Sequence, residues 1–212
     1  ESTTNAIINS TYGCAGMRCM ALPVVVVQES IADEFVKMLK EKAQKLTVGC
    51  AYDPATKLGP VVSAAHQKRV CDWIQKGVDE GAQLVLDGRG IKVPGYENGF
   101  FVGPTIFDRV KPGMSVGDCE IFGPVTLVKR VKDFDEGLAL MNANPFANGS
   151  VIFTQSGYYA RKFSFLTDGG MVGINVGIPV PSAYFPFSGN KDSFFGDLHV
   201  LGKDGVRFYT RA

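Results

Sequence analysis

The residues best suited to chemistry lie near the N-terminus, in Gly16-Met17-Arg18-Cys19. A cysteine directly follows an arginine there, between an amphipathic segment and an apolar run that is expected to form a strand. A thiolate in such a loop could act as a nucleophile. The alternative is that Cys19 packs as a small hydrophobic residue, since free cysteine is among the most buried residue types. Taken alone, the pair of Arg18 and Cys19 favours a packed cysteine over a nucleophile, because inert structural cysteines are common.

A second stretch, about a hundred residues downstream, favours a nucleophilic role for Cys19 over simple packing. It reads Glu120-Ile121-Phe122-Gly123-Pro124-Val125. A loop that turns at Gly-Pro and enters a strand would explain Gly123 and Pro124. It would not require Glu120 or Phe122. A carboxylate accepts hydrogen bonds from sugar hydroxyls, and an aromatic ring packs on a flat heterocycle. Together the two side chains suit a ribose that carries nicotinamide.

Helices and strands are expected to alternate along the chain, which predicts an α/β fold with a largely parallel, twisted sheet flanked by helices. Ser30 with Asp33 resembles a capping box, and Ser63 is expected to cap a further helix. The helices are expected at 3–12, from Ser30 to about Leu46, from Ser63 to Gly81, and at 133–142 and 157–166. The strands are expected at 22–28, 83–86, 124–131, 150–154 and 171–176, and residues 101–110 are expected to form a strand pair or an extended segment.

Two segments lack any regular period. Residues 87–99 are rich in glycine and are expected to form a surface excursion. Residues 177–196 are rich in aromatic residues, glycine and proline, and a loop of that length inside a compact domain is usually functional. The residues just before Arg211-Ala212 are expected to form a strand.

The composition excludes several classes of protein. The 212 residues are 45% hydrophobic and 20% charged, as in an ordinary soluble globular protein. A net charge of +1 argues against a nucleic-acid or membrane surface, and the longest apolar runs are only of strand length. Five irregularly spaced cysteines argue against a disulfide scaffold or a zinc site, and reduced thiols indicate an intracellular compartment. The only histidines, His66 and His199, are expected at the surface or packed on a helix, and no metal site is expected.

The order of motifs resembles that of the aldehyde dehydrogenase superfamily. Its members share a Gly-x-x-Cys loop before a valine-rich strand, with Glu-Ile-Phe-Gly-Pro-Val about a hundred residues later. Three further segments here are similar to the superfamily's downstream motifs, and Gly196-Asp197 stands where Gly-Arg-Glu is usual. These segments are Asn142-Ala143-Asn144-Pro145-Phe146-Ala147-Asn148-Gly149, Gly173-Ile174-Asn175-Val176 and Pro186-Phe187-Ser188-Gly189-Asn190-Lys191.

Within the superfamily the chain most resembles the methylmalonate-semialdehyde dehydrogenase branch. Four less usual segments carry this resemblance: Arg18-Cys19-Met20-Ala21-Leu22, Gly95-Tyr96-Glu97-Asn98-Gly99, Ile178-Pro179-Val180-Pro181 and Phe208-Tyr209-Thr210. The sequence departs from the usual pattern at Met17, where glutamine is common, and at Cys119, where a second acid is usual.

The resemblance implies a mechanism. Cys19 would attack an aldehyde, hydride would pass to NAD held by Glu120 and Phe122, and an acyl-thioester would form on Cys19. In this branch the acyl group loses its carboxylate and passes to CoA. Arg18 is either a partner of the substrate carboxylate or a structural residue, in a salt bridge or in a contact at a helix C-terminus. Its guanidinium would favour a thiolate only if the two groups meet. Phe187 either lines the acyl pocket or packs in the core, and Lys191 is expected to be a solvated loop lysine.

The resemblance also implies that residues 1–212 form a catalytic domain without the superfamily's dinucleotide-binding domain. The isolated chain is therefore expected to show no NAD-dependent turnover, and the full-length protein is expected to form a homo-oligomer. The compartment would be the mitochondrial matrix in a eukaryote or the cytoplasm in a bacterium. Two alternatives stay open: a dehydrogenase of another small semialdehyde with water as acyl acceptor, and a non-catalytic subunit-interaction module.

Overall fold

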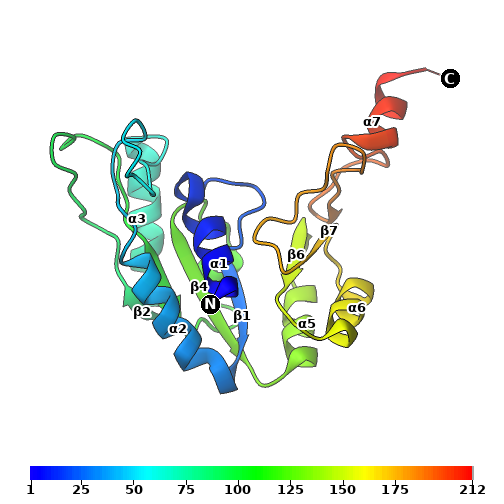
Figure 1. Cartoon of the computed structure of the whole chain (residues 1–212), viewed down its shortest axis with the longest axis horizontal. Coiled ribbons are helices and arrows are strands. Elements are labelled where there is room, and N and C mark those ends of the chain that lie inside the picture. The colour runs from blue at the N-terminus through cyan, green and yellow to red at the C-terminus, as the bar shows by residue number, and fades with distance from the viewer. Residues whose placement is uncertain (212) are drawn as a thin grey trace. The chain divides into compact units, whose positions relative to one another are not determined.

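The computed structural model describes residues 1–211 and divides into two compact units, Glu1–Asp133 and Phe134–Ala212 (Figure 1). Ala212, which follows the predicted C-terminal strand, lies outside the described residues. The fold alternates helices and strands, so the predicted α/β class is confirmed. That residues 1–212 act together as one catalytic domain stays a prediction.

The first unit is built on a four-stranded sheet in the order β1-β4-β3-β2. β1 (Val24–Gln28) and β3 (Thr105–Asp108) both pair with β4 (Val125–Val131) in parallel. β2 (Gln83–Leu86) is antiparallel to β3 at one edge, so the sheet is mixed but largely parallel. β3 and β4 are central and buried at nearly every position, as continuous apolar runs predict for strands covered on both faces.

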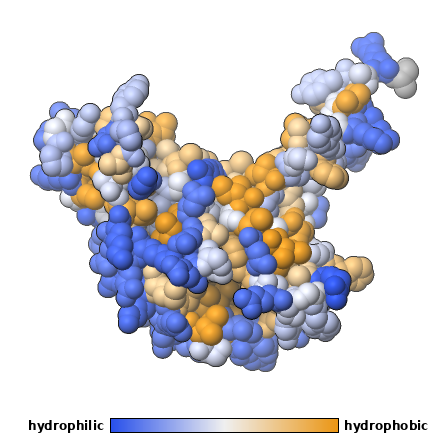
Figure 2. Space-filling model, viewed as in Figure 1, coloured by the Kyte–Doolittle hydropathy of each residue, from blue (hydrophilic) through white to orange (hydrophobic). Residues whose placement is uncertain are grey.

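The helices of the first unit are α1 (Ser2–Tyr12), α2 (Glu29–Ala43), α3 (Ala64–Asp79) and the short α4 (Ser115–Asp118), and the 3-10 turn η1 (Gly13–Gly16) follows α1. α1 and α2 lie side by side over β1 and β4 (Figure 1). The outward face of α2 is largely hydrophilic (Figure 2), and its buried residues recur at helical spacing. These are Ala32, Phe35, Val36, Leu39 and Ala43.

The N-terminal caps predicted for two helices can be compared with the structure, and only one of them is present. Ser63 caps α3 as predicted, because its side chain accepts a hydrogen bond from the His66 N–H. The predicted capping box of Ser30 and Asp33 is wrong, since α2 begins one residue earlier, at Glu29, and has no side-chain cap. Asp33 instead pairs with the Arg130 guanidinium at 2.7 Å.

Arg130 is the buried centre of an ion-pair cluster that joins the sheet to α2. Its guanidinium contacts Asp108 on β3 at 2.6 Å and Glu29 on α2 at 2.8 Å. The side chains of Arg130 and Asp108 are only 7% and 4% exposed, so each charge depends on the other for compensation. The hydrogen bonds to Asp108, then to Asp33 and Glu29, raise the pKa of Arg130 above its ordinary value despite desolvation.

The second unit contains three helices, α5 (Phe134–Asn142), α6 (Gly157–Leu166) and α7 (Gly202–Tyr209), within its described residues. β6 (Gly149–Ile152) pairs with β7 (Met171–Ile174) in parallel, and β5 (Phe146–Ala147) pairs with β8 (Asn190–Lys191) in antiparallel register. The predicted loop at 177–196 is confirmed except for β8. The strand expected before Arg211 is wrong: α7 occupies this segment, and Asp204 and Arg207 pair at 3.7 Å one turn apart.

Glu80, just after α3, ties that helix to α4. Its carboxylate accepts hydrogen bonds from the Ser115 and Val116 N–H groups, both at 3.1 Å, and from the Ser115 hydroxyl. These donors lie at the start of α4, where backbone N–H groups lack partners within the helix. The Ser115 hydroxyl, followed by the two N–H groups, holds the pKa of the Glu80 carboxyl below its usual value.

We therefore expect Glu80→Gln to reduce the free energy of unfolding at neutral pH, and the deficit to shrink in acid. A lowered folded-state pKa means that the carboxylate stabilises the fold above about pH 4.5. This contribution disappears as the pH falls through the folded-state pKa. Urea unfolding at several pH values measures the difference. The exposed Glu41→Gln is the matched control, and a Glu80→Gln deficit that is independent of pH would contradict the assignment.

Candidate active site

Cys19 lies on an exposed turn between α1 and β1. The base of this loop is closed by two hydrogen bonds of 3.0 Å: the Thr11 hydroxyl donates to the Leu22 carbonyl, and the Leu22 N–H donates to the Ser10 hydroxyl. Across the turn the Ala21 N–H donates to the Arg18 carbonyl at 3.1 Å. The exposure of the thiol argues against the alternative that Cys19 packs as a small hydrophobic residue.

The loop starts in left-handed backbone and is packed against the second predicted motif. Cys14, Ala15 and Gly16 have φ values of 51°, 53° and 73°. A Cβ on Gly16 would lie only 2.1 Å from the carbonyl oxygen of Gly123, and a Cβ on Gly123 would lie 2.7 Å from Val70. The absence of a side chain at Gly16 therefore lets the Cys19 loop touch the Glu120–Val125 segment, and the absence of one at Gly123 lets that segment pack on α3.

The Glu120–Phe122 loop turns its polar and aromatic side chains outward. Glu120 is exposed, Phe122 is 37% exposed, and Ile121 between them is buried at 5%. Phe122 has a φ of 60°, which is unfavourable for any residue with a Cβ. Such strain persists only where surrounding contacts impose it, and it concentrates at functional sites. The predicted pair of Glu120 and Phe122 thus lies exposed on a backbone that other residues hold in place.

α3 supplies the contacts that hold this loop. The Arg69 guanidinium donates to the Ile121 carbonyl at 2.5 Å and to the Glu120 carbonyl at 2.9 Å. The His66 ring nitrogen Nε2 lies 2.8 Å from the Phe122 carbonyl oxygen. The sequence predicts a surface or helix-packing role for His66 and does not single out Arg69. His66 and Arg69 are three residues apart, so the sequence indicates that they share one face of the helix. It does not indicate that they contact the Glu120–Phe122 loop.

Arg18 makes the contact at a helix C-terminus that was one of its two predicted roles. Its Nε donates to the Cys14 sulfur at 3.3 Å and its Nη1 donates to the Asn9 carbonyl, near the end of α1, at 3.1 Å. The guanidinium lies directly over Gly13, where a Cβ would come within 2.6 Å of it. The guanidinium is therefore hydrogen-bonded to Cys14 rather than to Cys19. A contact of Arg18 with a substrate carboxylate stays a prediction.

Phe187 belongs to the second unit, where it is half-buried. Its N–H donates to the Val200 carbonyl at 2.7 Å, which links the two ends of the segment 187–200. Its burial is compatible with packing in the second unit. The predicted role of Phe187 in lining an acyl pocket stays a prediction.

The prediction that Lys191 is a solvated loop lysine is only partly right, because the residue is exposed but lies on β8 and its ammonium has partners. Its ammonium pairs with Asp168 at 2.7 Å and also donates to the Asn142 and Asn144 carbonyls. Lys191 also pairs with Phe146 across β5 and β8, so two of the predicted downstream motifs meet at this point. The physical reason is that the lysine satisfies carbonyls after α5, which the sequence alone could not assign to it.

The five cysteines are free, and Cys14 and Cys119 are exposed as well as Cys19. The pKa of Cys50 is lowered by the Tyr52 N–H and by the Tyr96 hydroxyl, whereas burial raises the pKa of Cys71. A thiol reagent therefore has several targets, and any test of Cys19 requires mapping of the modified residue.

Within residues 1–211 no cluster of three histidine, cysteine, aspartate or glutamate side chains could hold a metal ion. The same residues include no helix with the length and hydropathy needed to cross a membrane.

The fold is α/β, and an exposed thiol lies beside a loop that bears a carboxylate and an aromatic ring. These features define a candidate enzyme site of the thiol-dependent class. The aldehyde dehydrogenase family model matches the whole chain, residues 1–212, and the chain belongs to this family.

Individual relatives show which members of this family the chain is similar to. The chain is 49% identical over 211 residues to malonate-semialdehyde dehydrogenase 2 of Oceanobacillus iheyensis, covering all of this chain and 43% of that protein. A Sinorhizobium meliloti protein assigned as methylmalonate-semialdehyde dehydrogenase, solved with NAD, superimposes with a TM-score of 0.97 at 43% identity. Methylmalonate-semialdehyde dehydrogenase of Oceanimonas doudoroffii gives 0.96 at 45% identity. Both structures cover 99% of this chain, which spans 43% of each of theirs, less than half their length.

We expect Gly16→Ala to destabilise the first unit more than Gly90→Ala does. The two glycines have nearly equal φ values, 73° and 71°, but only Gly16 has backbone atoms in the way of a Cβ. Gly90→Ala should cost roughly 1–2 kcal/mol of left-handed strain. Gly16→Ala should cost about 1–3 kcal/mol more, because the new methyl group must displace the Gly123 segment. Urea unfolding measures both, and equal losses would show that this contact does not constrain the loops.

Proposed function

We propose that this chain is the catalytic domain of an NAD-dependent, CoA-acylating methylmalonate- or malonate-semialdehyde dehydrogenase. The observation that carries the proposal is the packing of the exposed Cys19 loop against the Glu120–Phe122 loop through Gly16 and Gly123. Membership of the aldehyde dehydrogenase family and the relatives' names support this choice of reaction. Because the chain spans less than half of these relatives, the activity of the whole protein is part of the proposal.

The residues present fit a nicotinamide riboside. Glu120 offers carboxylate oxygens to ribose hydroxyls, and the half-exposed Phe122 ring offers an apolar surface to a flat heterocycle. Arg69 and His66 fix the backbone beneath them, so little ordering is needed when a ligand binds. When bound, NAD supplies the hydride acceptor for oxidation of the aldehyde.

Cys19 performs the covalent chemistry in this proposal. Its thiolate attacks the aldehyde carbon, and the resulting oxyanion is stabilised by the Cys19 backbone N–H. Loss of hydride from the same carbon leaves an acyl-thioester on Cys19. The turn presents the sulfur to solvent and so leaves room for both the aldehyde and a later nucleophile.

The second half of the reaction releases the acyl group. The carboxylate leaves as carbon dioxide or, with water, as bicarbonate, and the α-carbon takes up a proton from water in its place. The CoA thiolate then attacks the thioester carbonyl and displaces the Cys19 thiolate. The products are free Cys19 and propionyl-CoA from methylmalonate semialdehyde, or acetyl-CoA from malonate semialdehyde. Arg18 and Phe187 are the proposed substrate contacts, for the carboxylate and the acyl chain respectively. A homo-oligomer in a reducing intracellular compartment completes the proposal.

An activated ester tests the nucleophile and the acyl acceptor without any need for NAD. We expect p-nitrophenyl propionate to acylate Cys19, which releases p-nitrophenolate and adds one propionyl group to the peptide that contains Cys19. Adding CoA should then remove the group as propionyl-CoA, measured by mass spectrometry. Cys19→Ser should abolish both steps. Cys50→Ser is the matched control, because Cys50 lies outside the site and has a lowered pKa.

The alternatives predict other outcomes. Hydrolysis of the Cys19 thioester at a rate that CoA does not change would favour water as acyl acceptor. Acylation spread over Cys14, Cys50 and Cys119, with no preference for Cys19, would favour the non-catalytic interaction module and overturn the proposal.

A further inference from the structure

Three groups at the end of α1 hold the guanidinium of Arg18. Its Nε donates to the Cys14 sulfur at 3.3 Å, and its Nη1 donates to the Asn9 carbonyl at 3.1 Å. The same carbonyl accepts the N–H of Gly13, where a Cβ would come within 2.6 Å of the guanidinium. A carbonyl oxygen has two lone pairs, so it can accept both bonds at once. The half-buried Arg18 side chain is therefore held in one orientation.

Cys14 presents its sulfur from an unusual backbone conformation. Its φ is 51°, the first of three successive left-handed residues, and the Met17 N–H donates to its carbonyl at 3.0 Å. Left-handed backbone is unfavourable for a residue with a Cβ and persists where surrounding contacts impose it. None of the motifs that carry the family resemblance includes Cys14. The contact with Arg18 thus gives this exposed cysteine a role that the motifs do not assign.

The charge of Arg18 has no counter-ion in the part of the chain that the structure describes. Neither of its two acceptors is a carboxylate, and no carboxylate pairs with it among residues 1–211. An arginine has five N–H groups, of which these contacts use one on Nε and one on Nη1. Within the same residues Nη2 donates no hydrogen bond. Arg18 therefore offers an uncompensated positive charge and free donors in a fixed place.

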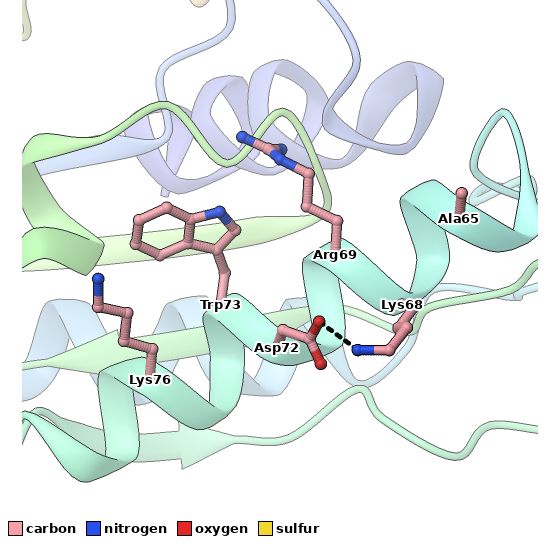
Figure 3. A pocket seen from close by; sticks show the side chains of 6 residues that line it. All are labelled: Ala65, Lys68, Arg69, Asp72, Trp73 and Lys76. Atoms are coloured by element: carbon pink, nitrogen blue, oxygen red, sulfur yellow. Dashed lines mark hydrogen bonds and ion pairs between the residues drawn. The ribbon is translucent and has the colours of Figure 1, made fainter.

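A second arginine beside the candidate site is used differently. Figure 3 shows the side chain of Arg69 projecting from α3. Its Nη1 and Nη2 both donate to carbonyls of the Glu120–Phe122 loop. Arg69 therefore holds a loop, whereas Arg18 keeps a whole terminal nitrogen for a ligand.

We propose that Cys14 is a positioning residue for Arg18 and thereby sets the preference of the site for an aldehyde that carries a carboxylate. The inference deepens the proposed function and rests on it, since there Cys19 attacks the aldehyde and Arg18 contacts the carboxylate. The sulfur of Cys14 holds the Nε edge of the guanidinium, so that Nη2 stays in place for the carboxylate.

A fixed guanidinium matters because the substrate is small. In malonate semialdehyde a single carbon separates the aldehyde from the carboxylate, so the contact with Arg18 must also hold the aldehyde carbon near the Cys19 sulfur. A small misplacement of the reacting atoms removes much of the benefit of binding. A mobile arginine would also lose rotamer freedom when the carboxylate binds, whereas the Arg18 side chain is already ordered.

Reversible addition of aldehydes to Cys19 measures the preference without NAD. The thiol adds across the carbonyl: sulfur bonds to carbon and the thiol proton passes to oxygen, which gives a hemithioacetal. Malonate semialdehyde and propanal, which has a methyl group in place of the carboxylate, should both slow the acylation of Cys19 by p-nitrophenyl propionate. The ratio of their inhibition constants, propanal over semialdehyde, measures the contribution of the carboxylate. Hydration of each aldehyde is the same for every variant and cancels when ratios are compared.

Substitutions at Cys14 provide the decisive comparison. Cys14→Ala should lower the ratio at least about threefold, because a hydrogen bond that orients Arg18 is lost. Cys14→Ser should keep the ratio near that of the unchanged chain, since a hydroxyl also accepts from Nε. Arg18→Gln should abolish the preference and gives the ratio without the contact. Cys50→Ala, which removes a thiol outside the site, is the matched control and should keep the ratio.

A merely structural role of Cys14 predicts a different result, because general loosening of the loop would change both inhibition constants by the same factor. An unchanged ratio in Cys14→Ala, an equal loss in Cys50→Ala or in Cys14→Ser, or a preference that survives Arg18→Gln would overturn the proposal.

Exchange of the Arg18 Nε–H with water tests the contact itself, independently of the enzymatic reaction. In an NMR spectrum of the isotope-labelled chain, this signal is the one absent from Arg18→Gln, and its exchange should be faster in Cys14→Ala. Faster exchange without any acylation of Cys19 would reject the proposed function and leave Cys14 as the residue that positions Arg18. Normal acylation of Cys19 with equal exchange in the two proteins would reject the inference and leave the proposed function standing.

Discussion

The close approach of the Gly16 and Gly123 backbones is the contact on which the candidate site depends. The sheet explains why two segments so far apart in the chain can meet there. The Cys19 loop leads into β1 and the Glu120–Pro124 segment leads into β4, and these neighbouring strands are parallel. The segments that precede parallel neighbours emerge at the same edge of a sheet. A side chain at Gly16 would keep the two loops apart, and one at Gly123 would push its loop away from Val70 on α3.

The rest of the first unit fixes the two loops at that edge. At the end of α1, the buried Tyr12 hydroxyl donates to the Thr105 carbonyl at 3.1 Å and accepts from the Thr126 hydroxyl at 2.9 Å. This anchors the start of the Cys19 loop to β3 and β4, and burial raises the pKa of the Tyr12 phenol.. On the other side, α3 holds the Glu120–Phe122 loop through Arg69 and His66. The candidate nucleophile and the candidate ribose contact are thus held mainly by backbone contacts, and their own side chains stay free for ligands.

The sequence predicts the helices and strands that depend on local residue patterns. It does not predict the contacts of a side chain whose partner lies far away in the chain. The strand 83–86 and the helix 157–166 coincide with the structure, because apolar periodicity and flanking glycines specify them. The capping box at Ser30 fails because Arg130, a hundred residues away, takes Asp33 as an ion-pair partner. The ion pair of Lys191 is missed for the same reason, since Asp168 lies in another segment. The motifs identify Cys19, Glu120 and Phe122 as candidates, but Arg69 has no motif and is found only through its contacts with carbonyl groups.

Arg18 shows how such contacts limit a role inferred from residue type. A substrate carboxylate that took the Nε and Nη1 protons now in use would displace its hydrogen bonds to Cys14 and to the Asn9 carbonyl. Each neutral hydrogen bond contributes about 0.5–1.5 kcal/mol, and a charged one about 1.5–3 kcal/mol. A carboxylate would bring a charge-assisted, bidentate contact in return. The exchange is therefore close to balanced, so Arg18 could accept an acidic aldehyde without binding it tightly. Preference for that substrate would then depend on the carboxylate keeping at least one of its bonds to Arg18 while Cys19 attacks.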